Sequence, residues 1–360
     1  MASHRHPDQE STGTDPTAHT GRPRRPRWRR LARFTGFAAL GLLVLVLVSA
    51  GLNFALTQYE RTSTDPYGRR VAVDGGSVNV VDDAADGPTV VLLSGLGTPA
   101  PALDFAPLVR ELDGYRVVVV EGFGYGYSNM TAPERTVENV SQELHAALKA
   151  AGVEAPYVLG GHSLAGFYIL DYVNRYPEEV SAVVGVDTTV PAFAADQDHA
   201  SAAEGGGVPW DRLASSTGLV RWVLLAAPDL ALPADTAHTS EERELINRMT
   251  VWNFTNPAVT DETRRIGDNA QQLEEVGFPA DLPVLVLLAQ DTVDNSPGWL
   301  ASHEKQLQGV NDHELVVLDG GHYLHWTRSP EIAARITGFL DEQDVAAQDG
   351  AGIAAPASAG

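Results

Sequence analysis

The sequence YVLGGHSLAGFYI, residues 157–169, passes from an apolar run through a glycine pair and a His-Ser dipeptide into a helix-like segment. This order is typical of a buried strand that turns sharply into a helix, with Ser163 at the turn. The residues two before and two after such a serine must be small, because the helix packs back across them. Gly161 meets this requirement, and Ala165 meets it with one methyl group to accommodate. Alone, the stretch is compatible with a catalytic serine or with an ordinary turn serine.

Apolar runs of the same kind recur along the chain. They are TVVLL (89–93), RVVVV (116–120), YVLGG (157–161), AVVGVD (182–187), PVLVLLA (283–289) and ELVVL (314–318). Short, β-branched and nearly continuous runs suit strands buried on both faces of a mostly parallel sheet. Helical patterns fall at residues 103–112, 136–150, 164–176, 299–308 and 330–341. The alternation predicts an α/β fold with a doubly wound sheet, preceded by a hairpin in residues 69–81.

The spacing of these runs also predicts the domain organisation. Residues 66–187 and 283–342 are expected to form the two parts of one α/β core. Residues 188–282 separate two strands that a short crossover would normally join, and we expect them to form an inserted helical cap. Three of the six tryptophans fall in this cap, namely Trp210, Trp222 and Trp252. Apolar aromatic side chains there favour a substrate with an apolar part. Residues 343–360 are of low complexity and are expected to form a flexible tail.

An uncharged apolar run occupies residues 34–56. It is long enough to cross a bilayer as a helix, so we predict a transmembrane helix at residues 34–57. Residues 1–33, which carry eight arginines and no apolar periodicity, are expected to be a disordered cytoplasmic segment. Seven of those arginines flank the run directly, which predicts that everything after it lies outside the cytoplasm. Cleavage of a signal peptide near Val48-Ser49-Ala50, followed by secretion, is the alternative.

The composition excludes some classes of partner. The net charge is −22, and the chain beyond residue 33 carries 17 basic and 44 acidic residues, so binding to nucleic acid is not expected. The chain has no cysteine, which excludes disulfides and thiolate metal sites. No metal and no cofactor is expected, since the sequence lacks a phosphate-binding loop and its remaining histidines lack ligand spacing. Those histidines include His199, His238, His313 and His325. The sequence does not indicate an oligomeric state.

Other segments supply what a catalytic serine needs. A serine hydroxyl becomes a good nucleophile when an imidazole removes its proton and a carboxylate orients that imidazole. His322 follows a predicted strand in LVVLDGGHYLHW and is a candidate for this base. The loop SGLG, residues 94–97, also follows a strand. The backbone N–H groups of Leu96 and Leu164 could together form an oxyanion hole.

Taken together, these motifs resemble the α/β-hydrolase superfamily in its cap-bearing branch, over about residues 70–342. The family's H-G-x-G loop appears as residues 94–97, its D-x-x-G-x-G-x-S loop as 121–128, its elbow as GHSLAG, and its G-x-G-H as 319–322. The resemblance implies that Ser163 is the nucleophile and His322 the base. Three family residues are replaced here, and the replacements are Ser94 for His, Glu121 for Asp and Ala165 for Gly. The first two concern hydrogen bonds near the oxyanion loop, and the third concerns the packing of the elbow.

The sequence leaves the acid open among three aspartates. Most family members carry it after the penultimate strand as G-x-x-D, but that position holds Thr292 here. Asp294 lies two residues beyond it and Asp291 one before it. A minority branch, which resembles fluoroacetate dehalogenases and some esterases, carries the acid on the strand after the elbow in a D-x-x-P pattern. VVGVDTTVP resembles that pattern with a proline one residue later, and we favour its Asp187, with Asp294 and then Asp291 as alternatives.

A serine at the elbow narrows the reaction. Dehalogenases and epoxide hydrolases of this fold require a carboxylate there, whereas Ser163 points to acyl transfer. We therefore expect a carboxylesterase-like serine hydrolase for small apolar acyl substrates. One alternative resembles proline iminopeptidases, with cap acids that would bind a substrate ammonium group. Those acids would be Glu241, Glu242 and Glu244. Another alternative is a catalytically silent binding protein with the same fold.

Overall fold

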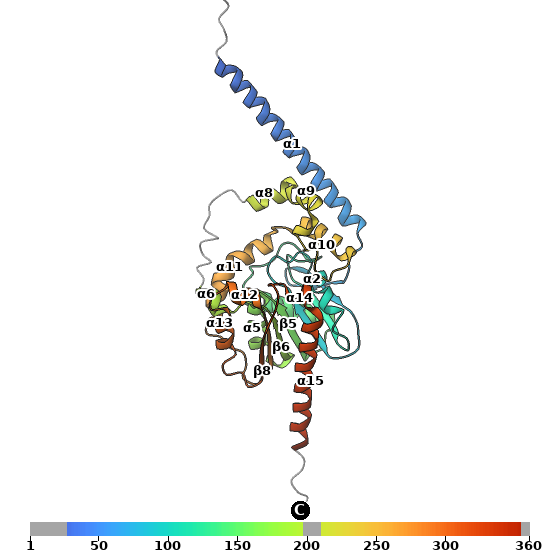
Figure 1. Ribbon diagram of the computed structural model, residues 1–360. Coiled ribbons are helices and arrows are strands. Elements are labelled where there is room, and N and C mark those ends of the chain that lie inside the picture. The colour runs from blue at the N-terminus through green and yellow to red at the C-terminus, as the bar shows by residue number, and fades with distance from the viewer. Residues whose placement is uncertain (1–26, 197–209, 354–360) are drawn as a thin grey trace, which may run out of the picture. The chain divides into compact units, whose positions relative to one another are not determined.

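The structure, a computed structural model, describes residues 27–196 and 210–353 (Figure 1). Contacts divide the chain into two units, residues 1–48 and residues 49–360. The first unit contains the N-terminal part of helix α1 (Arg27–Ser63), and the second contains the rest of that helix, the sheet and all the other helices.

Eight strands form a single sheet in the second unit. They are β1 (Arg69–Val73), β2 (Gly76–Asp82), β3 (Thr89–Leu93), β4 (Arg116–Glu121), β5 (Tyr157–His162), β6 (Val180–Val186), β7 (Val284–Ala289) and β8 (His313–Leu318). Their order in the sheet is β1-β2-β4-β3-β5-β6-β7-β8. β2 runs antiparallel to both of its neighbours. The remaining neighbours, in the order β4-β3-β5-β6-β7-β8, are parallel to one another. The predicted α/β fold with a mostly parallel sheet is confirmed.

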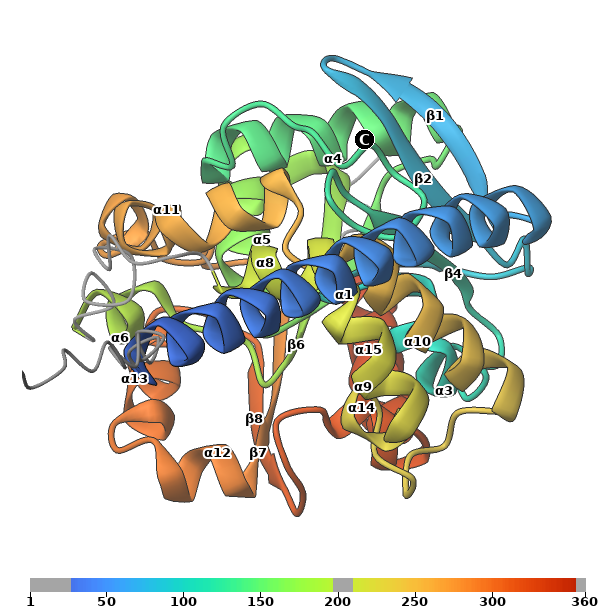
Figure 2. The same cartoon turned by 90° about the horizontal axis from the view of Figure 1, so that it is seen from above.

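Helices cover both faces of this sheet (Figure 2). They are α2 (Pro101–Asp104), α3 (Ala106–Val109), α4 (Val137–Ala151), α5 (Ala165–Arg175), α12 (Gln290–Asn295), α13 (Trp299–Gln306), α14 (Leu324–Thr327) and α15 (Ser329–Ile353). Side chains alternate along β3, so that Val91 packs with α4 and α5 in one core cluster and Val90 packs with α3 and α15 in another. Burial on both faces explains why the strands are nearly continuous apolar runs.

The segment between β6 and β7 forms helices in its described parts. They are α6 (Pro191–Asp196), α8 (Trp210–Thr217), α9 (Leu219–Ala226), α10 (Ser240–Asn253) and α11 (Pro257–Leu273). Thr239 and Glu242 form a capping box at the start of α10, and Asn256 caps α11. These caps satisfy backbone N–H groups that would otherwise lack partners. The predicted helical insertion is therefore present, and residues 197–209 of it lie outside the described residues.

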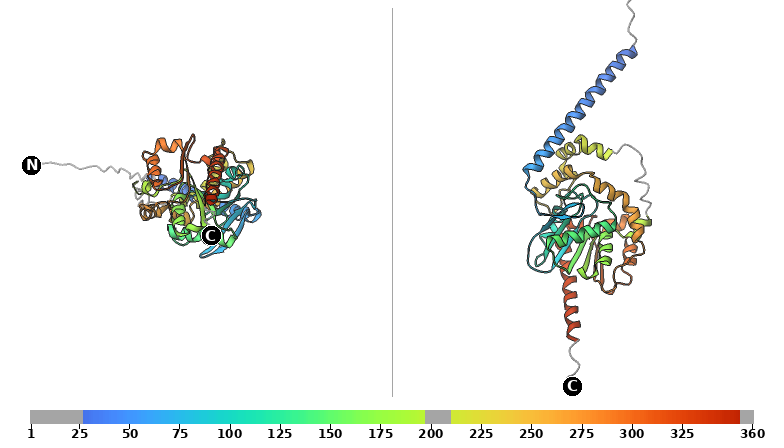
Figure 3. Two further views of the ribbon diagram at one scale, coloured as in Figure 1. Left: turned by 90° about the horizontal axis from the view of Figure 1, so that it is seen from below. Right: turned by 180° about the vertical axis from the view of Figure 1, so that it is seen from behind.

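Both ends of the chain are more helical than expected. α1 begins at Arg27, so residues 27–33 are helical although they were predicted to be disordered. At the other end, α15, drawn in red in Figure 3, continues to Ile353 and so includes part of the predicted tail. Alanine and glutamine in this part of α15 favour helix, which explains the extension. Residues 1–26 and 354–360 lie outside the described residues.

Helix α1 has the composition of a membrane span. Within its segment Phe34–Ser63, the most apolar 18-residue window has a mean hydropathy of 2.3, and none of that window is buried in the protein. A signal sequence has the same properties, so the apolar helix is observed whereas its fate and sidedness stay predictions.

Candidate active site

Ser163 lies in a tight turn between β5 and α5. Its φ angle is 55°, a left-handed conformation that few non-glycine residues adopt. The turn is fixed by the Ser163 carbonyl, which accepts hydrogen bonds from the amides of Gly166 (3.1 Å) and Thr189 (2.8 Å). Ala165 is fully buried, and a Cβ added to Gly161 would lie only 2.7 Å from the Ala165 Cβ. The extra methyl group of Ala165 is thus accommodated because residue 161 is glycine.

The turn brings Ser163 to two residues distant in sequence. Its Oγ lies 2.9 Å from Nε2 of His322, and Nδ1 of His322 lies 2.7 Å from Oδ2 of Asp187. A carboxylate can only accept, so Nδ1 carries the proton that His322 donates to Asp187. In the neutral ring Nε2 is then an acceptor for the Ser163 hydroxyl. His322 lies in the loop after β8, and its side chain is 35% exposed.

Asp187 is completely buried at the end of β6. Besides His322, its carboxylate accepts hydrogen bonds from the Ala289 amide (3.1 Å), the Thr292 hydroxyl (2.5 Å) and the Trp299 indole N–H (3.0 Å). These donors compensate for the loss of water around a buried charge. They also hold the carboxylate in one orientation toward His322.

Neither of the other two candidate acids forms a hydrogen bond with His322 in the part of the chain that the structure describes. Asp294 and Asp291 are both exposed, and Asp294 accepts a hydrogen bond from the Gln290 side chain. The reason is that α12 begins directly after β7 and carries these side chains to the surface. Thr292, which occupies the family's G-x-x-D position, instead donates its hydroxyl proton to Asp187.

The loop after β3 lies close to Ser163. A Cβ added to Gly95 would come within 2.8 Å of the Ser163 Cβ, so only glycine fits this approach. Within the described residues, neither the Leu96 amide nor the Leu164 amide donates to a protein acceptor. The amide of Gly97 donates to the hydroxyl oxygen of Tyr125 at 3.2 Å. The amides of Leu96 and Leu164 are therefore available to a bound group.

A buried acid from the cap supports this loop, and the sequence analysis did not anticipate it. The Tyr125 hydroxyl donates to Glu262 of α11 at 2.6 Å, and the Tyr168 hydroxyl donates to the same carboxylate at 2.5 Å. Burial raises the pKa of Glu262 above its ordinary value, although its hydrogen bonds oppose the shift. No sequence motif contains Glu262, and only its packing against the loop identifies it.

Glu121, one of the three departures from the family pattern, is also fully buried. Its carboxylate accepts hydrogen bonds from the Asn79 side chain, the Tyr67 hydroxyl and the amides of Tyr127 and Ala102. Burial raises the pKa of Glu121, and these donors act in the opposite direction. The longer side chain thus connects the loop after β4 with helix α2, which begins at Pro101, a few residues after the glycine loop at residues 94–97.

Three histidine rings cluster beside Ser163. The centroid of the His162 ring lies 4.4 Å from that of His322 and 4.7 Å from that of His325. His162 donates from Nε2 to the carbonyl of His322 at 3.0 Å, which helps to fix the loop that carries His322. His325 is itself fixed by Asp104, whose carboxylate lies 2.8 Å from Nε2. The ring of His162 is therefore a structural support of the site.

Burial of the His162 ring makes the free energy of unfolding depend on pH. Burial first, and then the nearby His325 and His322, lower the pKa of His162 well below that of an ordinary histidine. Below about pH 6.5 the unfolded chain therefore binds a proton that the folded chain does not, so stability is complete above this pH and is lost as the pH falls. We expect His162 to reduce the free energy of unfolding by about 1.4 kcal/mol per pH unit between pH 6.5 and its folded pKa. Urea denaturation of the full chain in detergent micelles, followed by tryptophan fluorescence, measures this slope.

A matched pair of variants tests whether His162 causes this pH dependence of the free energy of unfolding. His162→Gln should reduce the slope by about 1.4 kcal/mol per pH unit, which corresponds to one proton. Ser141→Ala, which changes a buried residue of α4 but removes no titratable group, should leave it unchanged. Equal slopes in the wild type and His162→Gln would show that His162 makes no contribution.

A cavity of about 210 Å³ opens next to Leu96 and Tyr323. The aromatic side chains on its wall are Phe254, Tyr323 and Trp326. The cap tryptophans predicted for this role lie elsewhere, because Trp222 donates to Ser49 and Trp252 donates to Glu60, both in α1. The side chain of Trp210 lies outside the described residues.

The three cap acids considered for a substrate ammonium group do not line this cavity either. Glu242 forms the capping box of α10 and an ion pair with Arg110. Glu244 pairs with Arg248, and Glu241 is exposed. All three lie near the start of α10, and none of them lines the cavity beside Leu96.

The sequence was compared with protein-family models and with known proteins. Residues 88–329 match the sequence model of a family described as alpha/beta hydrolase fold. "Uncharacterized protein YbdG" of Bacillus subtilis (strain 168) is 26% identical over 308 residues, which are 83% of this chain and 93% of that protein. "Lipase 3" of Moraxella sp. (strain TA144) is 28% identical over 169 residues, or 44% of this chain and 53% of the lipase.

Among solved structures, the epoxide hydrolase VrEH1 from Vigna radiata is similar with a TM-score of 0.60 and 20% identity. The likeness covers 76% of this chain and 97% of that one. At this level of identity, the likeness concerns the fold alone.

Proposed function

The chain belongs to the α/β-hydrolase fold family, and on that basis we propose that it is a serine hydrolase that cleaves ester bonds through an acyl-enzyme. The observation that carries the proposal is the continuous hydrogen-bonded chain from the Ser163 hydroxyl through His322 to the buried carboxylate of Asp187. The 28% identity with a protein named as a lipase supports an ester as the substrate. An epoxide would require a carboxylate at residue 163.

In the proposed mechanism, Ser163 Oγ forms a bond to the acyl carbon while its proton passes to Nε2 of His322. The oxyanion accepts hydrogen bonds from the amides of Leu96 and Leu164. The tetrahedral intermediate then collapses, the bond to the alcohol oxygen breaks, and His322 returns the proton to the alcohol. Water, deprotonated by His322, hydrolyses the acyl-enzyme by the same steps. Asp187 holds His322 in the required tautomer throughout.

The proposed substrate has a small apolar acyl part. The cavity beside Leu96 is lined largely by apolar side chains, among them Leu232, Ile246 and Trp326. We also propose that α1 remains attached as a membrane anchor, with the catalytic unit outside the cytoplasm. The exposed apolar side chains of α1 and the arginines that precede it support this topology.

A fluorophosphonate probe tests the proposed mechanism, because it reacts with an activated serine and mimics the acyl intermediate. We expect one adduct per chain, located on Ser163 by peptide mass spectrometry, and hydrolysis of p-nitrophenyl butyrate in preference to proline-nitroanilide. Prior denaturation of the protein should abolish labelling, since the reactivity depends on His322. An absence of any adduct in the folded protein would contradict the proposal in favour of a silent binding protein.

A further inference from the structure

Helix α9 packs against the C-terminal half of α1 and forms hydrogen bonds with it. Arg221 of α9 is buried, and its guanidinium donates to Asn53 (2.8 Å), Thr57 (2.8 Å) and Glu60 (2.5 Å). Asn53, Thr57 and Glu60 recur at helical spacing, so they lie on one face of α1. A buried arginine with three such partners holds the two helices together within the second unit.

An adjacent side of α9 is apolar and exposed. Leu219, Trp222 and Val223 share one helical face and are 54%, 37% and 40% exposed. We call these three residues the α9 face. The only charged residue of α9 is Arg221, which points to α1 instead. A face of this kind is unfavourable in water and is typical of a surface that contacts another apolar phase.

The contacts with α1 fix how deep the α9 face would lie in a bilayer. The indole N–H of Trp222 donates to Ser49 Oγ at 2.7 Å, and Ser49 lies within the apolar run that ends at Leu56. At a rise of about 1.5 Å per residue, Ser49 is about 10 Å from the end of that run. Interfacial helices place their apolar face about 5–10 Å into the boundary between headgroups and acyl chains. Trp222 is therefore within the depth that the apolar face of an interfacial helix reaches.

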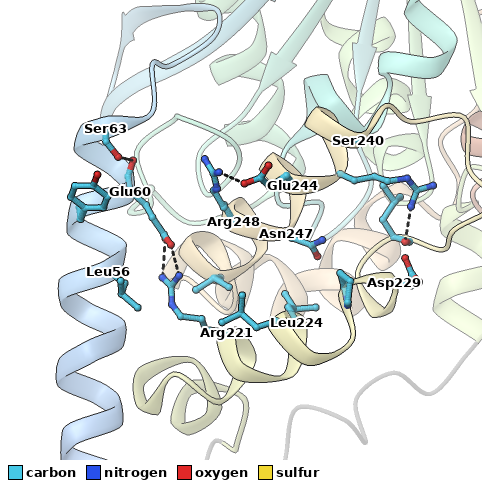
Figure 4. Close-up of a pocket in the computed structure, with 16 residues that line it drawn as sticks. Leu56, Glu60, Ser63, Arg221, Leu224, Asp229, Ser240, Glu244, Asn247 and Arg248 are labelled. Atoms are coloured by element: carbon cyan, nitrogen blue, oxygen red, sulfur yellow. Dashed lines mark hydrogen bonds and ion pairs between the residues drawn. The ribbon is translucent and has the colours of Figure 1, made fainter.

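Beyond the level of Ser49, toward the C-terminal end of α1, the side chains become polar. A cavity of about 700 Å³ lies between α1, α9 and α10 (Figure 4). Leu56 and Leu225 line its apolar part, whereas Glu60, Arg248 and Glu244 line its polar part. The change from apolar to charged lining coincides with the end of the apolar run of α1. The same arrangement occurs where a membrane-bound surface passes from acyl chains to headgroups.

We propose that α9 lies in the interface of the bilayer that α1 enters, with the α9 face inserted among the acyl chains. The cap is then a second membrane contact, beside the anchor itself. The bilayer is favoured over a second copy of the chain, because the α9 face continues the exposed apolar surface of α1 at Leu52 and Phe54. The proposal goes beyond the ester hydrolysis proposed above and does not depend on it.

Site-specific fluorescence in vesicles tests this placement, since the chain contains no cysteine and a single introduced cysteine is the only thiol. Leu219→Cys, labelled with bimane in the full chain, is reconstituted into phosphatidylcholine vesicles that contain doxyl-labelled lipid. We expect the doxyl lipid to reduce the emission at least about twofold. Glu304→Cys, exposed on α13, is the control in contact with water, and its emission should be unchanged.

Leu45→Cys, in the middle of the apolar run of α1, reports separately on the anchor. Strong quenching at residue 45 with none at residue 219 would overturn the placement of α9 while leaving the anchor intact. A blue shift at residue 219 that doxyl lipid does not quench would mean that protein, such as a second copy, covers the α9 face, and would also overturn it. Absence of quenching at both positions would overturn it together with the anchor. Hydrolysis of p-nitrophenyl butyrate, measured on the same samples, keeps the proposed function separate from these outcomes.

Discussion

Replacing Ser163 by alanine is expected to lower kcat for ester hydrolysis by about 10⁵- to 10⁶-fold. Without Oγ no acyl-enzyme can form, and His322 has no hydroxyl to deprotonate at 2.9 Å. The amides of Leu96 and Leu164 remain, so some catalysis above the rate in water should persist. The measurement is hydrolysis of p-nitrophenyl butyrate by the full chain in detergent micelles.

The fold should tolerate this substitution, because alanine meets the φ angle of 55° at residue 163 with no more strain than serine does. Ser141→Ala is a matched control, since Ser141 is a buried serine of α4 whose hydroxyl has no partner among the described residues. It should retain wild-type kcat. If Ser163→Ala retained kcat within a few-fold of the wild type, the nucleophile would have to be another group.

The sequence was sufficient to predict most of the core, for a physical reason. Strands β3 to β7 are buried on both faces, so apolar runs mark them directly, and glycines mark the turns at their ends. The turn at Ser163 could be predicted because Gly161 and Ala165 are small for a local steric reason. The serine's partner His322 could be predicted only through the family resemblance, since 159 residues separate the two positions.

The acid could not be selected by spacing alone. The choice among Asp187, Asp291 and Asp294 depends on how the chain leaves β7, and α12 begins there without a loop. The contacts of Thr292 and Trp299 with Asp187 join segments more than 100 residues apart, so no local pattern reveals them.

The function of the cap tryptophans was harder to predict for a related reason. Tryptophan is favoured both in substrate pockets and at membrane interfaces. The hydrogen bonds of Trp222 and Trp252 to α1 hold both side chains against that helix rather than in the cavity beside Leu96, and they are visible only in the folded chain.

Replacing Asp187 by asparagine is expected to lower kcat by about 10⁴-fold with little change in KM. The amide nitrogen of asparagine is a donor, whereas His322, Thr292 and Trp299 all present donors to this position. His322 would then adopt the other tautomer, with the proton on Nε2, where it can no longer accept the proton of Ser163. Steady-state kinetics with p-nitrophenyl butyrate, at a pH above 8 and at pH 7, measure the loss.

Asp294→Asn is the matched control, because it makes the same chemical change to an exposed aspartate that the sequence also suggested. We expect its kcat to stay within about twofold of the wild type, as for other exposed substitutions. A loss in Asp294→Asn comparable to that in Asp187→Asn would require α12 to unwind and bring residue 294 to His322. A loss in Asp294→Asn alone would assign the acid to the segment after β7. The Thr292→Val variant adds a graded test, since it removes one of the four donors to Asp187 and should therefore reduce kcat far less than Asp187→Asn.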